Sequence, residues 1–315
     1  MTTFKLGTRG SRLALTQSDW VRRRVEEASG ARVELEVIQT TGDRDQERPL
    51  PEIGGKGLFT MELDRALLAG EIDFAVHSLK DLPTQAEPGL TVVCVPERED
   101  ARDVLLGPRG EGVSLATLPE GAVLGTSSLR RQALARAFRP DLDVRDIRGN
   151  VDTRLRKLDE GRYDAVVMAA AGIRRMGLEA RIGEWLESTA WLPAPGQGAL
   201  GIVARDGDDV VGRALASLRH DPTWQAVRAE RAFLAALEGG CQVPIGALGM
   251  PYQGGLRLWG LVASPDGRSV VRGDLTGRAE DPEALGGELA RLARSRGAAR
   301  ILDELAAAAS DAVGE

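Results

Sequence analysis

The chain has 315 residues, of which 43% are hydrophobic and 28% charged, and its formal net charge is −6. This composition is typical of a soluble globular protein of two or three domains. Two cysteines, Cys94 and Cys241, exclude a disulfide framework, and no apolar run approaches the ~20 residues of a membrane-spanning helix. The first residues lack the basic and apolar segments of a signal peptide, so we expect a cytoplasmic protein.

Apolar runs typical of strands alternate with helical patterns over the first two thirds of the chain. The first series predicts strands at residues 4–8, 33–39, 72–76 and 90–95, with helices at 13–28 and 58–68. The second series predicts strands at residues 122–125, 144–148 and 165–170, with helices at 129–138 and 151–159. The charged residues 97–103 would cross between the two series. This alternation predicts two α/β domains, each with a mostly parallel sheet.

The last third has a different order. After the Pro- and Gly-rich residues 193–198, the pattern predicts a strand at 200–204, a helix at 222–237 capped by Asp221, a hairpin of residues 256–263 and 268–275, and helices at 282–293 and 299–309. We expect a small α+β domain here. The polar residues 41–57 hold four glycines and two prolines, which is typical of a lid or a disordered segment.

Positive charge is concentrated between Thr126 and Lys157, where nine Lys/Arg against four Asp give a local charge of +5. Three hydroxyls at residues 126–128, then Arg130 and Arg131, lie where a strand ends and a helix begins, a position that favours an anion. Arg148 follows the next strand in the same way. Ligands bind at the carboxyl ends of strands in such sheets, so these cations are expected to share one cleft. Ordinary helix capping with solvated arginines is the alternative. Because aromatic residues are scarce, a small polycarboxylate or phosphate is favoured over nucleic acid.

Two further segments carry candidate functional residues. Asp81 follows the strand at 72–76 and would be a carboxylate among cations, suited to stabilising positive charge or moving protons. A weak surface pair with Lys80 is the alternative. His77 is interpreted as structural, since no partner for it is apparent. Gly196, Gly198 and Gly201 have dinucleotide-site spacing, but prolines precede them and a strand follows, so we reject that site.

Cys241 lies in the run Gly239-Gly240-Cys241-Gln242-Val243-Pro244. Glycine permits close approach of another group and a thiolate forms covalent bonds, so we expect something to be attached here. A hydrolase nucleophile is less favoured, because neither histidine offers a base. Cys94 is predicted to be a buried strand residue. The two cysteines and two histidines show no metal-ligand spacing.

Several long motifs occur in one order along the chain. They are Thr8-Arg9-x-Ser11-x-Leu13-Ala14, Gly54-Gly55-Lys56-Gly57-Leu58-Phe59, Ala75-Val76-His77-Ser78-Leu79-Lys80-Asp81, Gly125-Thr126-Ser127-Ser128-Leu129-Arg130-Arg131, Arg148-Gly149-Asn150-Val151-x-Thr153-Arg154-Leu155, Tyr163-Asp164-Ala165, Ala171-Gly172-x-x-Arg175, Gly196-Gln197-Gly198 and Glu238-Gly239-Gly240-Cys241-Gln242-Val243-Pro244. With these motifs the chain closely resembles the porphobilinogen deaminase family, also called hydroxymethylbilane synthases, along nearly its whole length.

The resemblance implies an α/β fold with two periplasmic-binding-protein-like (type II) domains, a cleft between them, and a small α+β C-terminal domain. The first domain would comprise residues 1–97 and 199–217, the second residues 98–198 and the third residues 218–315. The family's members also suggest a monomer.

The resemblance further implies a transferase of haem and tetrapyrrole biosynthesis. In that family four porphobilinogen molecules are condensed head to tail, each losing ammonia, onto a dipyrromethane cofactor, and hydrolysis then releases hydroxymethylbilane. Cys241 would hold the cofactor through a thioether. Asp81 would be the catalytic residue, facing the pyrrole nitrogens.

Each pyrrole carries two carboxylates, which explains a cleft lined with cations. By the family pattern, the residues that bind cofactor or substrate are Arg9, Ser11, Lys56, Ser78, Lys80, Thr126, Ser127, Ser128, Arg130, Arg131, Arg148, Gly149, Arg154, Ala171, Gly172, Arg175, Gln197 and Gly198. Arg12 stands where many members have proline, and Val203 where many have glutamate. Neither is a presumed catalytic position.

A solute-binding protein has the same two-domain plan without the chemistry and is the alternative. Such a protein would normally be exported and would have no use for Gly-Gly-Cys. The partners expected are porphobilinogen and its oligopyrrole intermediates. We expect no nucleic acid, membrane or metal partner.

Overall fold

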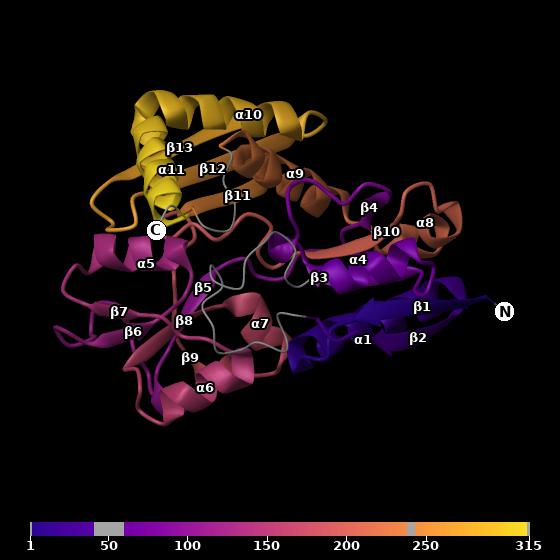
Figure 1. Ribbon diagram of the computed structural model, residues 1–315, viewed down its shortest axis with the longest axis horizontal. Coiled ribbons are helices and arrows are strands. Elements are labelled where there is room, and N and C mark those ends of the chain that lie inside the picture. Colours follow the sequence, from indigo (N-terminus) through magenta and orange to yellow (C-terminus); the bar gives the residue numbers. More distant parts are fainter. Residues whose placement is uncertain (1, 41–59, 238–242, 314–315) are drawn as a thin grey trace.

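The computed structural model describes residues 2–40, 60–237 and 243–313 (Figure 1). Its strands are β1 (Thr3–Thr8), β2 (Arg32–Val37), β3 (Phe74–Ser78), β4 (Leu90–Cys94), β5 (Asp103–Leu106), β6 (Val123–Gly125), β7 (Asp143–Arg145), β8 (Ala165–Ala169), β9 (Ile182–Trp185), β10 (Leu200–Arg205), β11 (Ile245–Tyr252), β12 (Gly255–Ala263) and β13 (Val270–Gly277). Its helices are α1 (Arg12–Ser29), α4 (Met61–Leu68), α5 (Leu129–Phe138), α6 (Val151–Asp159), α7 (Ala170–Arg175), α8 (Asp209–Leu215), α9 (Asp221–Ala236), α10 (Pro282–Ala293) and α11 (Ala299–Val313).

Two five-stranded sheets share one strand order. The first is β2-β1-β3-β10-β4 and the second is β7-β6-β8-β5-β9. In each sheet one strand, β10 or β5, is antiparallel to both neighbours, and the other four run in one direction. The predicted mostly parallel sheets are therefore confirmed. The chain leaves the first sheet after β4 and returns to it at β10, which is the type II arrangement that the resemblance implied.

A three-stranded antiparallel sheet, β11-β12-β13, forms the small C-terminal domain. Helices α9 and α10 cover one face, where Phe233 and Leu289 occupy the space left by the missing side chain of Gly260. Leu248 and Leu261 belong to the core that also contains Leu134 of α5, so the other face packs on the second α/β domain. Figure 1 shows this sheet lying between α10 on its outer side and α5 beneath it.

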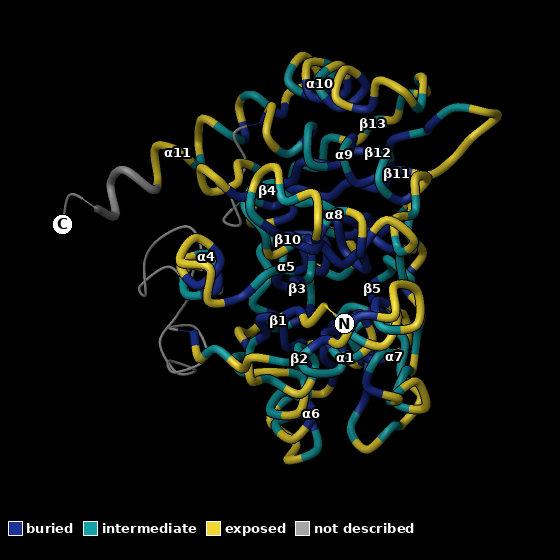
Figure 2. Tube along the Cα trace, turned by 90° about the vertical axis from the view of Figure 1, so that its right-hand side faces the viewer, coloured by how far each residue is buried: buried dark blue, intermediate teal, exposed yellow. Residues whose placement is uncertain are grey.

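Burial follows the alternation of each strand. Phe74 and Val76 of β3 pack in the core under α1, whereas Ala75 lies in the core under α4. In Figure 2 the central strands are buried, while α6 and α10 carry many exposed positions. Each fully buried large apolar side chain contributes roughly 1.5–3 kcal/mol to folding, so these two-sided cores hold the strand ends that carry the site.

Among the strands and α-helices of the described residues, five were not predicted from the sequence: β5, α7, β9, α8 and β11. β5 and β9 have four residues each, too few for a clear period. β11 contains Gly246, Gly249 and Pro251, residues that are depleted in strands. The predicted cap Asp221 was wrong by one residue, because His220 Nδ1 accepts the Thr223 amide at 3.3 Å. The predicted lid, residues 41–57, lies outside the described residues.

A buried carboxylate joins the crossing segments to the C-terminal domain. Glu230 of α9 is fully buried and accepts from both terminal nitrogens of Arg98, at 2.6 and 3.2 Å. It also accepts the backbone amides of Gly196 at 2.6 Å and Gly249 at 2.8 Å. Arg98 in turn donates from Nε to the Gln197 carbonyl at 2.6 Å. One carboxylate therefore fixes two chain segments that pass between the sheets.

Replacing Glu230 with alanine is expected to lower the free energy of unfolding by about 3–5 kcal/mol, because Arg98 is left buried without its partner. Denaturant unfolding measures this change. The matched control is Asp274→Ala, which removes the exposed ion pair with Arg257 and should change stability far less. Equal effects of the two substitutions would contradict a structural role for Glu230.

Candidate functional site

Two junctions of the first sheet open onto one pocket. Arg9 and Ser11 follow β1, and Asp81 ends the single 3₁₀ turn Leu79–Asp81 that follows β3. The pocket is lined by Arg9, Ser11, Leu13, Ala14, Gln17, Val76, His77, Ser78 and Asp81. The structure thus brings together four of the predicted site residues, with the exposed Asp81 carboxylate at the pocket wall.

Local bonds occupy part of this pocket's polar lining. Ser11 caps α1, accepting the Ala14 amide at 3.3 Å, and Ser78 Oγ accepts from Gln17 at 3.1 Å. His77 is buried, and burial together with the charge of Arg9 lowers the pKa of its imidazole to about 4. His77 is therefore uncharged at neutral pH.

The hydroxyls that precede α5 differ in their availability. Ser127 Oγ donates to the Ile147 carbonyl at 2.8 Å and accepts the Ile147 amide at 3.1 Å, which ties the two junctions of the second sheet together. Thr126 is buried, and its Oγ1 accepts the Ser128 amide at 3.3 Å. Ser128 caps α5 without a side-chain hydrogen bond. Its hydroxyl is therefore the best placed of the three to meet a ligand.

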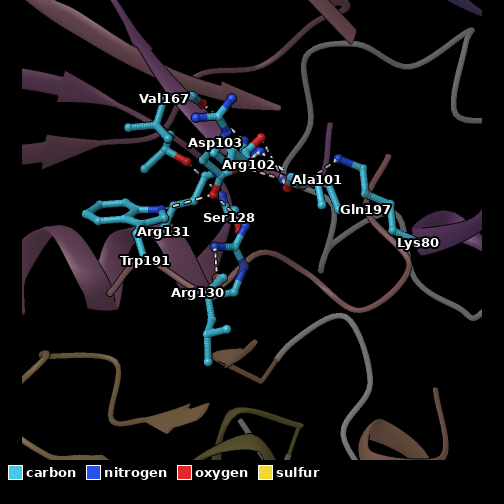
Figure 3. Close-up of polar contacts among 12 residues, drawn as sticks. Lys80, Ala101, Arg102, Asp103, Ser128, Arg130, Arg131, Val167, Trp191 and Gln197 are labelled. Carbon is cyan, nitrogen blue, oxygen red and sulfur yellow. Dashed lines mark hydrogen bonds and ion pairs between the residues drawn. The ribbon is translucent and has the colours of Figure 1, made fainter. Parts of the chain in front are cut away.

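Arg130 and Arg131 converge on one carboxylate, that of Asp103 at the start of β5 (Figure 3). Arg130 donates to Oδ2 at 2.8 Å and Arg131 to Oδ1 at 2.7 Å. Gln197 Nε2 donates to Oδ1 at 2.7 Å, and Trp191 Nε1 donates to Oδ2 at 3.0 Å. Burial alone would raise the pKa of Asp103, but the two arginines outweigh it and hold that pKa well below its usual range.

Gln197 connects this group of residues to the first sheet. Its Oε1 accepts from Lys80 Nζ at 3.2 Å and from Arg131 at 3.4 Å. Because Lys80 and Asp81 are neighbours in the chain, Gln197 links Arg131 to the turn that carries the predicted catalytic residue. The sequence placed Asp103 in a charged crossing segment and missed this role. The only sequence feature that could have indicated this role was an aspartate next to the segment that leads to the cationic junctions.

The junction after β7 supplies two more predicted residues. Gly149 has φ +108°, and a side chain there would collide with Thr153, so glycine is required. Arg154 Nε donates to the Gly149 carbonyl at 2.9 Å. Burial, then the charges of Arg131 and Arg148, lower the pKa of Arg154 to about 10, while Asp81 acts in the opposite direction. Arg154 therefore lies within electrostatic range of Arg131 and Arg148 in the second domain and of Asp81 in the first.

The other predicted residues that the structure describes lie within α7 or where the chain returns to the first sheet. Arg175 donates to the Gly198 carbonyl at 2.8 Å, and burial lowers its pKa to about 10. Gly198 has φ +86°, and a side chain there would collide with the Glu99 carbonyl. Ala171 is buried and Gly172 faces Leu13 of α1 across the two domains. Their contribution is close packing rather than charge.

Lys56 and Cys241 lie outside the described residues. The other cysteine, Cys94, is buried in β4 and its Sγ contacts the Leu215 carbonyl at 3.6 Å. Burial raises the pKa of this thiol to about 12, so it holds no thiolate at neutral pH. Within the described residues, no three His, Cys, Asp or Glu side chains are grouped as a metal site would need. Nor does any described helix have the length and apolar character to cross a membrane.

The chain was compared with known proteins. A family model described as "Porphobilinogen deaminase, dipyromethane cofactor binding domain" matches residues 4–213, and one described as "Porphobilinogen deaminase, C-terminal domain" matches residues 224–294. Porphobilinogen deaminase of Pelobacter propionicus is 50% identical over 303 residues, covering 96% of this chain and 97% of that protein. The Desulforudis audaxviator protein of that name is 53% identical over 308 residues, with coverages of 96% and 98%.

This chain belongs to the porphobilinogen deaminase family. Membership makes it a transferase of tetrapyrrole biosynthesis that carries a dipyrromethane cofactor and acts on porphobilinogen. Among solved structures, a periplasmic substrate-binding protein of an ABC transporter from Coxiella burnetii is 12% identical, with a TM-score of 0.44, and covers 69% of this chain and 92% of its own. At that score the likeness supports no further statement.

The residues of this deaminase site fit a ligand with several carboxylates. Among the described residues, the buried Nε atoms of Arg130 and Arg131 have no hydrogen-bond partner. Their terminal nitrogens also donate to the Leu192 carbonyl at 2.7 Å and the Val167 carbonyl at 3.1 Å, so both arginines are anchored as well as charged. Burial and, after it, the crowding of cations lower the pKa of Arg154, and an anionic ligand would relieve that crowding.

Lys80 is a titratable cation of the candidate site. Burial, then the charge of Arg131, lowers the pKa of its ammonium to about 8, with Arg130 acting in the same direction and Asp81 and Asp103 opposing. The ammonium is therefore charged below about pH 8 and lost above it. We expect kcat/KM for porphobilinogen to fall as pH rises through this value, because a carboxylate-binding charge disappears.

Lys80→Arg should remove that alkaline limb, since a guanidinium stays charged. Steady-state rates between pH 6.5 and 9.5 measure it. The matched control is Lys5→Arg, at an exposed position of β1 away from the pocket, which should keep the wild-type profile. If kcat/KM still falls at high pH in Lys80→Arg, the fall belongs to the titration of another group.

Proposed function

We propose that Asp81 is the catalytic residue of this porphobilinogen deaminase, that Cys241 carries its dipyrromethane cofactor, and that the cations of both sheets hold the carboxylates of cofactor and substrate. The cofactor supplies the pyrrole carbon to which the first porphobilinogen is joined. Each addition breaks the C–N bond of the substrate's aminomethyl group, releases ammonia and leaves positive charge on the pyrrole. A fixed carboxylate beside that charge stabilises it.

The position of Asp81 carries this proposal. It is an exposed carboxylate that lines the pocket with Arg9, Ser11 and Ser78, and its charge acts on both Lys80 and Arg154. Surrounding cations bind the anionic groups of a substrate. A positively charged pyrrole would then meet one negative group in a field of positive ones. That arrangement separates binding of the substrate's carboxylates from stabilisation of its ring.

The same cations define the remaining roles that we propose. Ser128, Arg131, Arg148 and Arg154 would bind carboxylates from the second sheet, and Arg9 and Lys80 from the first. Arg130 and Arg175 would bind carboxylates with them. Each of Arg130, Arg131, Arg154 and Arg175 also donates to a backbone carbonyl, so these arginines shape the cleft as well. Lys56 is proposed as a binding residue on the family pattern alone.

Incubation of the purified protein with porphobilinogen tests the activity. We expect ammonia and linear tetrapyrrole in a ratio of about four to one, because each of four additions releases one ammonia. Ammonia is measured by a coupled assay and tetrapyrrole by its absorbance after oxidation. Tight binding of porphobilinogen without ammonia release would instead support the solute-binding alternative.

We also propose the domain bounds, the oligomeric state with the location, and the absence of metal and nucleic-acid partners. The domains would comprise residues 1–97 with 199–217, 98–198, and 218–315, supported by the membership of β10 in the first sheet. The protein would act as a monomer in the cytoplasm. It would use neither metal nor nucleic acid, because the carboxylate and cations described above supply the charge stabilisation that the reaction needs.

A further inference from the structure

Arg130 and Arg131 cannot share a target through helix geometry alone. Consecutive residues of an α-helix point about 100° apart, so their side chains do not face each other. Both guanidiniums nevertheless meet at Asp103, which is buried and reached from four different side chains (Figure 3). The carboxylate is the common acceptor that makes the two arginines converge.

We propose that Asp103 is a positioning residue for the reaction: it directs the guanidiniums of Arg130 and Arg131 and, through Gln197, the ammonium of Lys80. This inference rests on the proposed function, in which these cations bind carboxylates. It assigns to Asp103 no contact with the substrate.

The link to Lys80 follows from the chemistry of the Gln197 amide. An ionised carboxylate only accepts hydrogen bonds, so the NH₂ group of Gln197 must face Asp103, where it also donates to the Ala101 carbonyl at 2.7 Å. The amide oxygen then faces the opposite way and accepts from Lys80 at 3.2 Å. An asparagine at position 103 could donate as well as accept. Backbone carbonyls alone, chiefly that of Ala101, would then hold the Gln197 amide in this orientation, so the hold on Lys80 would weaken.

Charge and positioning predict opposite effects of Asp103→Asn on substrate binding. The substitution removes a negative charge from a cationic site, so on charge alone the substrate's carboxylates bind more tightly and KM falls. If Asp103 positions the cations, KM for porphobilinogen instead rises, by at least about tenfold, as expected when charge-assisted bonds lose their geometry. The sign of the change in KM therefore distinguishes positioning by Asp103 from an effect of its charge alone.

A second readout does not depend on turnover. Lys80 is surrounded by Arg131, Arg130, Asp81 and Asp103, and Asp103 raises its pKa. The pH dependence of acetylation of Lys80 by acetic anhydride, followed by peptide mass spectrometry, reports that pKa directly. In Asp103→Asn holoenzyme the midpoint should move below the wild-type value of about 8. The exposed Lys5 in the same molecule is the internal control, and the midpoint of its acetylation should stay unchanged.

Asp159→Asn is the matched control variant. Asp159 ends α6 in the same domain and accepts from Arg181 at 2.6 Å and from the Arg109 amide at 2.7 Å, so it also joins a guanidinium to the backbone. It has no bond to Lys80, Gln197 or Asp103 among the described contacts. We expect wild-type KM, kcat and Lys80 midpoint in this variant, even if its melting temperature falls.

Unchanged or lower KM in folded Asp103→Asn holoenzyme overturns the proposal and leaves Asp103 a purely structural residue. If that variant does not fold, Trp191→Phe takes its place, because it removes one donor to Asp103 while keeping the charge and the aromatic packing on Phe138. We then expect KM to rise about two- to threefold, by partial loss of one hydrogen bond. Wild-type KM and Lys80 midpoint in Trp191→Phe would overturn the proposal as well. Failure of the wild-type protein to release ammonia would instead contradict the proposed function.

Discussion

Replacing Asp81 with alanine is expected to lower kcat by ~10²–10⁴ while the protein stays folded and keeps its cofactor. Asp81 is exposed at the end of a 3₁₀ turn, so its removal opens no cavity in the core. Its charge acts on Lys80 and Arg154, and no other carboxylate lines the pocket among the described residues. Nothing nearby would replace it in stabilising positive charge on the substrate.

Steady-state turnover, thermal melting and intact mass of the Asp81→Ala holoenzyme measure these effects together. Asp81→Asn keeps the shape and removes the charge, so it should be impaired almost as severely. The control is Glu71→Ala, which removes another exposed carboxylate of the same domain away from the pocket. If Asp81→Ala retained more than about a tenth of wild-type kcat, its general acid–base or charge-stabilising role would be ruled out.

Replacing Cys241 with serine is expected to abolish turnover and to remove a covalent mass equal to that of two linked pyrrole units. The chain offers only two cysteines. Cys94 is 1% exposed, and burial raises its pKa to about 12, so it has neither access nor a thiolate for attachment. Cys241 is therefore the cysteine at which we propose the cofactor to be attached.

Intact mass spectrometry of protein expressed with porphobilinogen available decides this assignment. Wild-type protein and Cys94→Ala should both carry the mass excess, and Cys241→Ser should match the bare polypeptide. Cys94→Ala is the matched control, since it deletes the other thiol and leaves the site untouched. A mass excess that survives in Cys241→Ser would place the attachment elsewhere.

Strong apolar periodicity made most elements of the chain predictable. The helices α5, α6 and α10 have the predicted bounds. α6 and α10 each present an apolar face at helical spacing, whereas α5 buries Arg130 and Arg131 together with alanine and leucine. The short strands β5 and β9 escaped prediction, because four residues carry little pattern and their stability comes from neighbours in the sheet. Local sequence therefore indicated the α/β class better than it indicated which strands pair.

The candidate site divides in the same way. Placement of Arg9, Asp81, Arg131 and Arg148 at strand ends followed from the chain order, because carboxyl ends of parallel strands meet at one edge of a sheet. The chain order did not show which of the predicted groups already bond to other parts of the protein. Ser127, predicted to hold a carboxylate, bonds to Ile147 in the neighbouring junction, and Arg130 bonds to Asp103 and Leu192. Whether these residues bind ligand stays a prediction.

The sequence by itself determined the alternation of strands and helices, the cations at the junctions, the scarcity of cysteine and, through its motifs, the family. Only the tertiary structure decided that Asp103 bonds to Arg130, Arg131 and Gln197. These three residues lie 27, 28 and 94 positions after Asp103 in the chain. It also decided that Lys80 has its pKa lowered to about 8. Residue types and their local spacing are written in the chain, whereas burial and long-range contact, which set charge and direction, exist only once distant segments are packed together.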